Sequence, residues 1–440
     1  MSRRNLVLLI ILLGAIIIVF FGFLYFRQES PTPTDTGGTN FFDQFNPFAT
    51  TPNKPPATGT PIDNTGSAEP KGEITKEKLR QVSSMPVAGF TLFTKERFKE
   101  TTPPVLPLSG EDVPHAKGGS GGQKTEFATA IRYVEKAEGL IYQTFVDKIE
   151  EKKFSKTIVP KIYEAFFGNK GESVVMRYLK NNDQAIETFV GAMPREYLGT
   201  DTNSTAEVKG SFLPENIIDL SVSSDGSKVF YLFNAGDGVI GTTFNFSDKR
   251  KTQIFDNAFT EWLSFWPSTK TITLTTKPSG TVLGYLYTLD TDTKRFSKIL
   301  GGISGLTTLG SPNGKLILYS DSSLASYMYH TDTKNVDVLS VKTLPEKCVW
   351  NKTSTFIYCA VPKIIEGGLY PDAWYQGEIS FSDQIWRVDV KSGNASMLID
   401  PAIVASGEEI DGIKLALDEG EKYLFFVNKK DSILWELELK

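Results

Sequence analysis

The sequence predicts an all-β protein: a β-propeller of about seven four-stranded blades, preceded by one transmembrane helix and a disordered linker. Three observations lead to this prediction: an apolar run near the N-terminus, a Pro/Thr-rich stretch after it, and short aromatic strands that recur at a nearly constant interval. We expect a cytoplasmic stub at residues 1–5, a membrane helix at 6–26, a linker at 27–75 and the propeller at 76–440.

The apolar run at residues 6–26 contains no charged residue. About 20 helical residues cross the hydrocarbon core of a bilayer, so the run predicts an uncleaved membrane anchor. A cleaved signal peptide is the alternative, but its apolar core is shorter and ends at a small-residue cleavage site, which FLYFRQES does not offer. Arg3 and Arg4 precede the run, so the positive-inside rule predicts a single-pass protein with a cytoplasmic N-terminus and an extracytoplasmic C-terminal domain.

The composition narrows the functional classes. The linker is rich in Pro, Thr, Gly, Asn and Ser, which cannot bury enough apolar surface to fold. The 47 basic and 52 acidic residues give a net charge of −5, which argues against a nucleic-acid partner. With only 2 Cys and 2 His, His115 and His330, the chain has few ligands for a metal site, and we expect no metal and no cofactor.

Two sequence elements repeat along the C-terminal part of the chain. One is a strand, a tight turn and an aromatic strand, as in LSVSSDGSKVFYLF and LGSPNGKLILY; the other is a strand that ends in an acidic turn, as in YTLDTDTKR and YHTDTKN. A period of about 40–45 residues with four short strands is typical of a propeller blade. We expect blades near residues 127–160, 161–200, 216–258, 259–302, 303–344, 345–402 and 408–440.

The last of these blades is short of a strand. Propellers protect their open sheet edges by closing the ring with a strand from one terminus, and residues 86–93 (PVAGFTLF) are the candidate. Six or eight blades, or a pair of β-sandwiches, stay open as alternatives.

The turn motifs SVSSDGSKVFY and GSPNGKLILY resemble those of the TolB-like and WD40-like (PD40) β-propeller repeat family. The resemblance covers about residues 220–440. It implies the propeller fold and is silent about ligand or reaction, because this fold serves many functions.

Cys348 and Cys359 flank a predicted hairpin. If its turn centres on Thr353 and Ser354, the two cysteines face each other across an antiparallel pair, close enough for a disulfide. Such a bond would persist outside the cytoplasm. The alternative is a pair of buried thiols that act as small apolar side chains.

An insertion at residues 362–381 interrupts the sixth predicted blade and contains Tyr370, Trp374 and Tyr375. Aromatic side chains dominate the energetics of many interfaces, so this is a candidate partner-binding loop. The alternative is that these rings pack over the blade or plug the central channel.

The sequence favours a binding or scaffold module for a protein or glycan of the cell envelope. The alternative is a hydrolase-like envelope enzyme with a carboxylate-based site on one propeller face, using residues such as Asp321 or Glu378; a purely structural envelope component is a third class. No residue set is singled out as catalytic: residues 118–122 match G-x-S-x-G without the strand and helix that a nucleophile elbow needs, His115 reads as a loop residue and His330 as a structural one.

Overall fold

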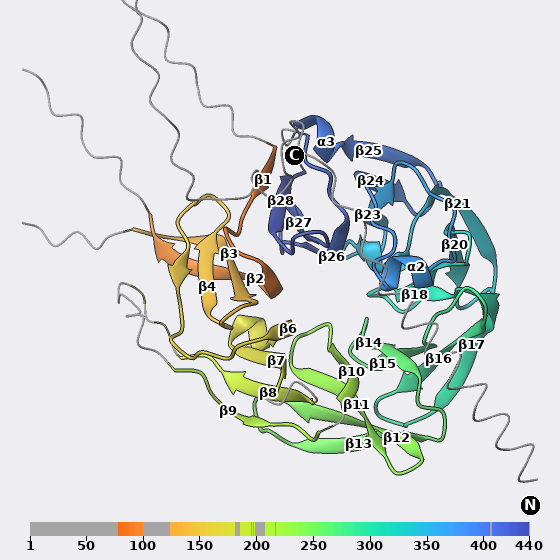
Figure 1. Cartoon of the computed structure of the whole chain (residues 1–440), viewed down its shortest axis with the longest axis horizontal. Coiled ribbons are helices and arrows are strands. Elements are labelled where there is room, and N and C mark those ends of the chain that lie inside the picture. Colours follow the sequence, from red (N-terminus) through yellow and green to blue (C-terminus); the bar gives the residue numbers. More distant parts are fainter. Residues whose placement is uncertain are drawn as a thin grey trace, which may run out of the picture. The chain divides into compact units, whose positions relative to one another are not determined.

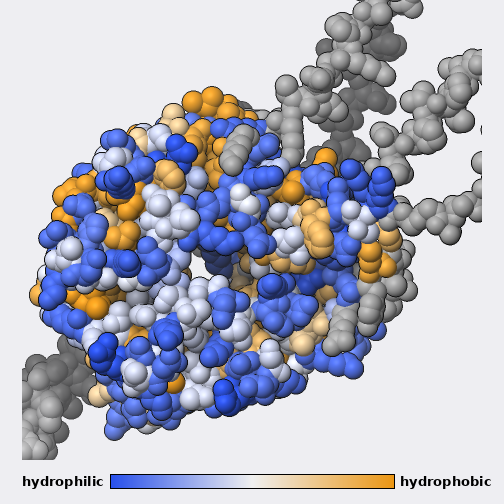
Figure 2. Space-filling model, turned by 180° about the vertical axis from the view of Figure 1, so that it is seen from behind, coloured by the Kyte–Doolittle hydropathy of each residue, from blue (hydrophilic) through white to orange (hydrophobic). Residues whose placement is uncertain are grey.

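The structure is a computed structural model that describes residues 78–99, 124–180, 185–194, 196, 198, 207–215, 217–404 and 407–439. The described residues form seven separate four-stranded antiparallel sheets, which radiate around a common axis (Figure 1). This is a seven-bladed β-propeller, as the repeat period predicts, and it excludes the pair of β-sandwiches. Seen from behind, the ring has a hole at its centre (Figure 2).

The first six blades are continuous in sequence, and each is listed from its innermost to its outermost strand. Blade one has β2 (Val87–Phe98), β3 (Thr125–Glu135), β4 (Ile141–Phe145) and β5 (Lys152–Lys153); blade two has β6 (Ile162–Gly168), β7 (Ser173–Leu179), β8 (Ile186–Ala192) and β9 (Lys209–Phe212); blade three has β10 (Ile217–Val222), β11 (Lys228–Ala235), β12 (Gly238–Asn245) and β13 (Lys251–Asn257).

Blade four has β14 (Trp262–Phe265), β15 (Thr271–Thr276), β16 (Leu283–Asp290) and β17 (Phe296–Ser304); blade five has β18 (Thr307–Gly310), β19 (Leu316–Ser320), β20 (Ala325–His330) and β21 (Val336–Lys342); blade six has β22 (Cys348–Trp350), β23 (Phe356–Pro362), β24 (Asp383–Asp389) and β25 (Ala395–Ile399). The described helices are short: η2 (Asn169–Gly171), η3 (Pro345–Lys347), α2 (Asp372–Tyr375) and α3 (Pro401–Val404).

Blade seven closes the ring. It combines β26 (Gly412–Leu417), β27 (Tyr423–Asn428) and β28 (Leu434–Glu438) with β1 (Leu79–Gln81), which pairs antiparallel with β28. Closure by an N-terminal strand is therefore correct in kind, but the choice of residues 86–93 is wrong. Those residues fall in β2, because β2 pairs with β3 over the whole length from Gly89 opposite Val134 to Phe98 opposite Thr125.

The blade limits also differ from the expected ones at the start of the propeller. Blade one begins at β2 rather than near residue 127, and β9 of blade two lies beyond residue 200. The structure departs from the sequence pattern here because each blade takes in a strand that a long connection separates from the others. The remaining blades lie close to the expected ranges.

The apolar core is divided among the gaps between blades. Seven hydrophobic clusters of the described residues each join two neighbouring blades, from Val134 and Val174 between blades one and two to Tyr133 and Phe425 between blades one and seven. A blade is buried on both faces, so its central strands are almost continuously apolar, as in β19. An eighth cluster forms where the insertion between β23 and β24 packs against residues of blade five and the entry to blade six.

No helix in the part of the chain that the structure describes is both long and apolar enough to cross a membrane. The predicted anchor at residues 6–26 and the predicted linker at 27–75 lie outside the described residues, as do His115 and residues 118–122.

Candidate functional site

One face of the ring carries the features that bear on function; we call it the cap face. Within each blade the strands alternate in direction, so the loops between second and third strands lie on the same face as the loops that enter the innermost strands. The insertion between β23 and β24 is one of these loops. Figure 1 shows its helix α2 near the inner edge of the ring, beside β18 and β26.

The insertion packs as a cap with its own apolar core. Tyr370, Trp374 and Phe381 are almost completely buried, together with Leu324 of blade five and Leu344 at the entry to blade six. The rings of Tyr370 and Phe381 stack with centroids 5.8 Å apart, and those of Trp374 and Phe381 stack at 6.3 Å. The insertion thus reaches over blade five instead of extending into solvent.

Two polar contacts of helix α2 fix the cap to blades four and seven. The Asp372 carboxylate accepts a hydrogen bond of 2.6 Å from the backbone N–H of Gly280 in blade four. Gly280 has no room for a side chain, because a Cβ there would lie 2.7 Å from the backbone carbonyl oxygen of Tyr370. Towards blade seven, Lys429 Nζ donates a 2.7 Å hydrogen bond to the carbonyl of Trp374. The cap therefore spans four consecutive blades.

A sealed ion cluster lies beneath the cap. The Lys347 side chain is completely buried, and its ammonium lies 2.7 Å from an Asp383 oxygen and also pairs with Asp411. It donates a third hydrogen bond, of 3.1 Å, to the Gly412 carbonyl. Trp374 Nε1 donates to Asp411 at 2.9 Å, so the cap and the ion cluster share a residue.

The two aspartates of this cluster respond differently to their surroundings. Burial raises the pKa of Asp383 to about 6, against the opposing effect of the Lys347 charge. The pKa of Asp411 lies below its ordinary value: burial acts to raise it, but Lys347 and the donors from Phe381 and Trp374 outweigh that effect. With no water-accessible surface on Lys347, the cluster joins blades six and seven and offers no group to a ligand.

The three aromatic residues of the predicted partner-binding loop differ in their exposure to solvent. Tyr370 and Trp374 are only 2% and 3% exposed, so the packing alternative describes them, since a partner cannot reach buried rings. Tyr375 is 38% exposed, and its hydroxyl donates to the carboxylate of Glu346 in η3. Desolvation and the Glu346 charge raise the pKa of Tyr375 well above its ordinary value.

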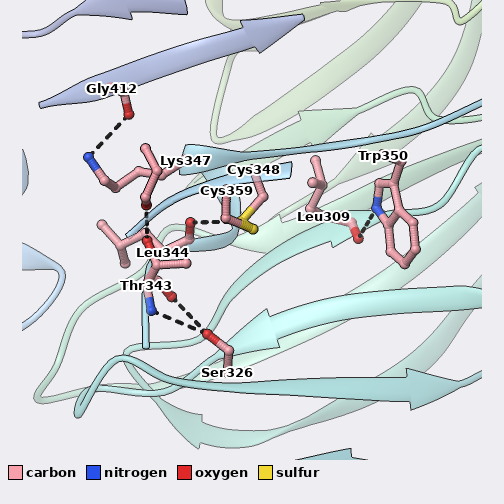
Figure 3. The surroundings of a disulfide bond; sticks show 10 residues. Leu309, Ser326, Thr343, Leu344, Lys347, Cys348, Trp350, Cys359 and Gly412 are labelled. Atoms are coloured by element: carbon pink, nitrogen blue, oxygen red, sulfur yellow. Dashed lines mark hydrogen bonds between the residues drawn. A yellow bond between two sulfur atoms is a disulfide. The ribbon is translucent and has the colours of Figure 1, made fainter. Parts of the chain in front are cut away.

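A disulfide joins Cys348 and Cys359 (Figure 3). The two residues lie opposite each other on β22 and β23, in the register expected from a turn near Thr353 and Ser354. Both side chains belong to the core between blades five and six. Figure 3 shows Lys347 directly before Cys348, with its ammonium bonded to Gly412. The disulfide therefore cross-links the β22–β23 hairpin, which begins directly after Lys347 of the sealed cluster.

Polar residues form links between neighbouring blades along the inner edge of the ring. Glu164, Asp219 and Lys414 are each the third residue of an innermost strand. Glu164 pairs with Arg177 of its own blade at 2.9 Å, and Arg177 donates a 3.0 Å hydrogen bond to a backbone carbonyl of β10 in blade three. Asp219 of blade three accepts two hydrogen bonds of 2.6 Å from Ser264 of blade four. Burial raises the pKa of Asp219 to about 6.

Lys414 and Lys136 complete this inner edge between blades seven and one. Lys414 Nζ crosses to blade one and donates to the Ala88 carbonyl at 2.8 Å. Lys136, just after β3, donates to Ser432 Oγ at 2.7 Å. Desolvation lowers the pKa of both ammonium groups.

The carboxylates of the enzyme alternative have ordinary surroundings. Asp321 caps its own turn by accepting hydrogen bonds from the N–H and hydroxyl of Ser323 and from the hydroxyl of Tyr327. Glu378 is an exposed residue of the cap. His330, on β20, contacts Asp337 at 2.8 Å on the partly exposed outer side of blade five. Nothing in these contacts brings the three side chains to a common point.

Potential metal ligands and cavities among the described residues add no further candidate site. No group of three or more His, Cys, Asp or Glu side chains is arranged there as ligands for a metal ion. An open pocket of about 510 Å³ lies between the outer parts of blades five and six; its lining includes Val341, Val361, Ile365 and Trp386. None of the predicted site residues lines it.

The fold thus places the chain in the class of seven-bladed β-propellers. No family model and no curated protein matches the sequence. Among solved structures, the chain is similar to one described as a putative 6-phosphogluconolactonase from Bacteroides fragilis, with 11% identity, a TM-score of 0.43, and coverage of 69% of this chain and 87% of that one. It is also similar to an oligogalacturonate lyase in complex with manganese, with 10% identity, a TM-score of 0.45, and coverage of 71% and 85%. Activity does not transfer across such identities.

Proposed function

We propose that this protein is a membrane-anchored, extracytoplasmic propeller that binds a partner protein of the cell envelope on its cap face. The observation that supports the proposal is a group of exposed apolar side chains at the start of β16 and on the cap, two segments that meet where Gly280 lies against Leu369. Val282, Leu283 and Leu369 are 59%, 51% and 46% exposed. The two segments that carry them lie side by side, because Gly280 is in contact with Leu369. We call these three residues the apolar rim.

A protein partner suits the apolar rim better than a glycan does. Apolar side chains that stay exposed on a rigid support are typical of protein interaction sites, because burying them in a complex removes unfavourable hydration. The support here is rigid, since Tyr370 and Trp374 anchor the loop that carries Leu369 and the Asp372 carboxylate holds the loop that carries Val282. Little conformational entropy would be lost on docking.

The membrane part of the proposal rests on the sequence. The apolar run at residues 6–26, with Arg3 and Arg4 before it, supports an anchor that leaves the propeller outside the cytoplasm. Carbonate extraction of membranes that contain the full chain tests this: an anchored protein stays in the pellet and a peripheral one is released. Release into the supernatant would refute the anchor and leave the apolar rim untouched.

The partner site is tested by one substitution and a matched control in the full chain. Leu369→Asp places a charge in the apolar rim, and Met397→Asp places the same charge on β25 at 49% exposure, away from the cap. We expect in-cell crosslinking to recover a partner with wild type and Met397→Asp and to lose it with Leu369→Asp. Equal recovery with both variants would place the binding site elsewhere.

A further inference from the structure

We propose that the inner rim between blades seven and one binds a small anion, a carboxylate or phosphate group, between the ammonium groups of Lys136 and Lys414. Both groups lie beside the start of β2. Lys414 Nζ is 2.8 Å from the carbonyl of Ala88. Lys136 Nζ is 2.7 Å from Ser432 Oγ, and the carbonyl of that same Ser432 accepts a 2.8 Å hydrogen bond from the N–H of Val87.

The two ammonium groups have donors to spare. An ammonium carries three N–H donors and no acceptor. Within the part of the chain that the structure describes, Lys136 and Lys414 each make one side-chain hydrogen bond, to a neutral oxygen, and neither forms an ion pair. Two neighbouring ammonium groups that both lack a carboxylate partner keep their full positive charge, so together they favour an anion over a neutral ligand.

The nearby carboxylates are already used by other groups. Glu164, which acts electrostatically on Lys414, binds Arg177 at 2.9 Å. Glu135, next to Lys136, accepts hydrogen bonds from the N–H groups of Ala137 and Glu138. An anion from solution is therefore the group that would complete the site.

Access and electrostatics favour a small ligand. The Lys414 side chain is exposed to solvent although it lies on an innermost strand, so water and small solutes reach it. Desolvation lowers the pKa of each ammonium group, and the charge of Lys136 contributes to that shift at Lys414. A bound anion would offset this repulsion through charge-assisted hydrogen bonds, which are the stronger kind.

The test is isothermal titration of the full chain in detergent with inorganic phosphate and with glucuronate, at constant chloride, and with glucose as the neutral comparison. We expect phosphate, glucuronate or both to bind, and glucose not to bind. A signal with phosphate alone or with glucuronate alone identifies the anionic group and supports the proposal. No binding of either anion by the wild type would overturn it.

Variants locate the site. Lys136→Met and Lys414→Met should each weaken anion binding about tenfold or more, as expected for the loss of one charge-assisted contact. Lys414→Arg keeps the charge and should retain binding, which separates a lost contact from a damaged fold. Lys315→Met removes an exposed lysine from the β18–β19 turn of blade five and should change nothing. Equal affinity in Lys414→Met and Lys315→Met would refute the site.

Discussion

Two lysines that contact blade seven, Lys347 and Lys414, have opposite surroundings. Lys347 enters blade six beneath the cap and is completely buried between Asp383 and Asp411. Lys414 lies on β26 at the inner edge of the ring and is exposed to solvent. Its ammonium donates a hydrogen bond to the neutral carbonyl of Ala88 and lies 5.9 Å from the centre of the Phe166 ring. The difference is the counterion. The buried ammonium of Lys347 is paired with two aspartates and holds blades six and seven together. The exposed ammonium of Lys414 has no carboxylate partner, and we propose that it binds an anion from solution.

The largest effect should separate these two lysines directly. Lys347→Met leaves two buried aspartates facing each other without their cation, and we expect a loss of about 3–5 kcal/mol in the free energy of unfolding. Lys414→Met removes no buried ion pair and should change stability by less than about 1 kcal/mol. Urea denaturation of the two variants checks this. A smaller loss for Lys347→Met than for Lys414→Met would reverse the comparison.

Removing the disulfide is the next largest change. Cys348 and Cys359 are 11 residues apart, and a cross-link of that span restricts the unfolded chain by about 3 kcal/mol. The double variant Cys348→Ala/Cys359→Ala should lose roughly that amount. Reductant should destabilise the wild type and leave the variant unchanged, which denaturation with and without reductant will show.

The same double variant also sharpens the comparison of the two lysines. The disulfide adjoins Lys347 and is remote in sequence from Lys414, so anion binding at the inner rim should survive its removal. If anion affinity falls together with stability, the sealed cluster and the inner rim are not independent.

Asp219 makes a third test, through pH. Burial raises its pKa to about 6 in the folded protein, above the value of about 3.9 for an unfolded chain. The folded state therefore holds the proton more tightly, and this contribution to stability is complete below about pH 4 and lost as the pH rises through 6. Between pH 4 and 7 the wild type should lose about 1–2 kcal/mol relative to Asp219→Asn, after allowance for water at the inner edge. Parallel stability curves for the two proteins would contradict the shifted pKa.

The smallest effect is expected at the exposed edge of the cap. Tyr375→Phe removes one hydroxyl hydrogen bond to Glu346 at a partly exposed site, and we expect a loss of about 0.5–1 kcal/mol. Its neighbour Trp374 is the matched control, because Trp374→Phe removes a buried donor to Asp411 and should cost more. Thermal denaturation of both variants ranks them. Equal losses would mean that the cap is as solvated at Trp374 as at Tyr375.

The propeller could be predicted from the sequence because the strands and turns of a blade depend on residues that are close together in the chain. Turns such as the one at Asp225 and Gly226 are built by side chains close in sequence: Asp225 accepts hydrogen bonds from Ser223 and Ser227. The cysteine register followed from one hairpin for the same reason. The closing strand was misplaced because β1 has three residues and no pattern of its own, while residues 86–93 form a mostly apolar run with the composition of a strand.

The sealed cluster gave no signal in the sequence. Lys347 is 36 residues from Asp383 and 64 residues from Asp411 in the sequence, and the three side chains come together only when blades six and seven are folded. An isolated lysine in PEKC reads as a surface residue, and Lys414 in IKLAL reads the same way. Whether the rings of Tyr370, Trp374 and Tyr375 faced a partner or a core also depended on Leu324 and Leu344, which belong to other blades.

The sequence by itself determined the repeat, the strand-turn chemistry and the expected bilayer-spanning run, since these depend on neighbours within a few residues. The tertiary structure alone decided which strand closes the ring, which aromatic rings are buried and which lysine keeps a counterion. Those outcomes depend on distances between residues far apart in the chain, and such distances exist only once the blades have closed around their axis.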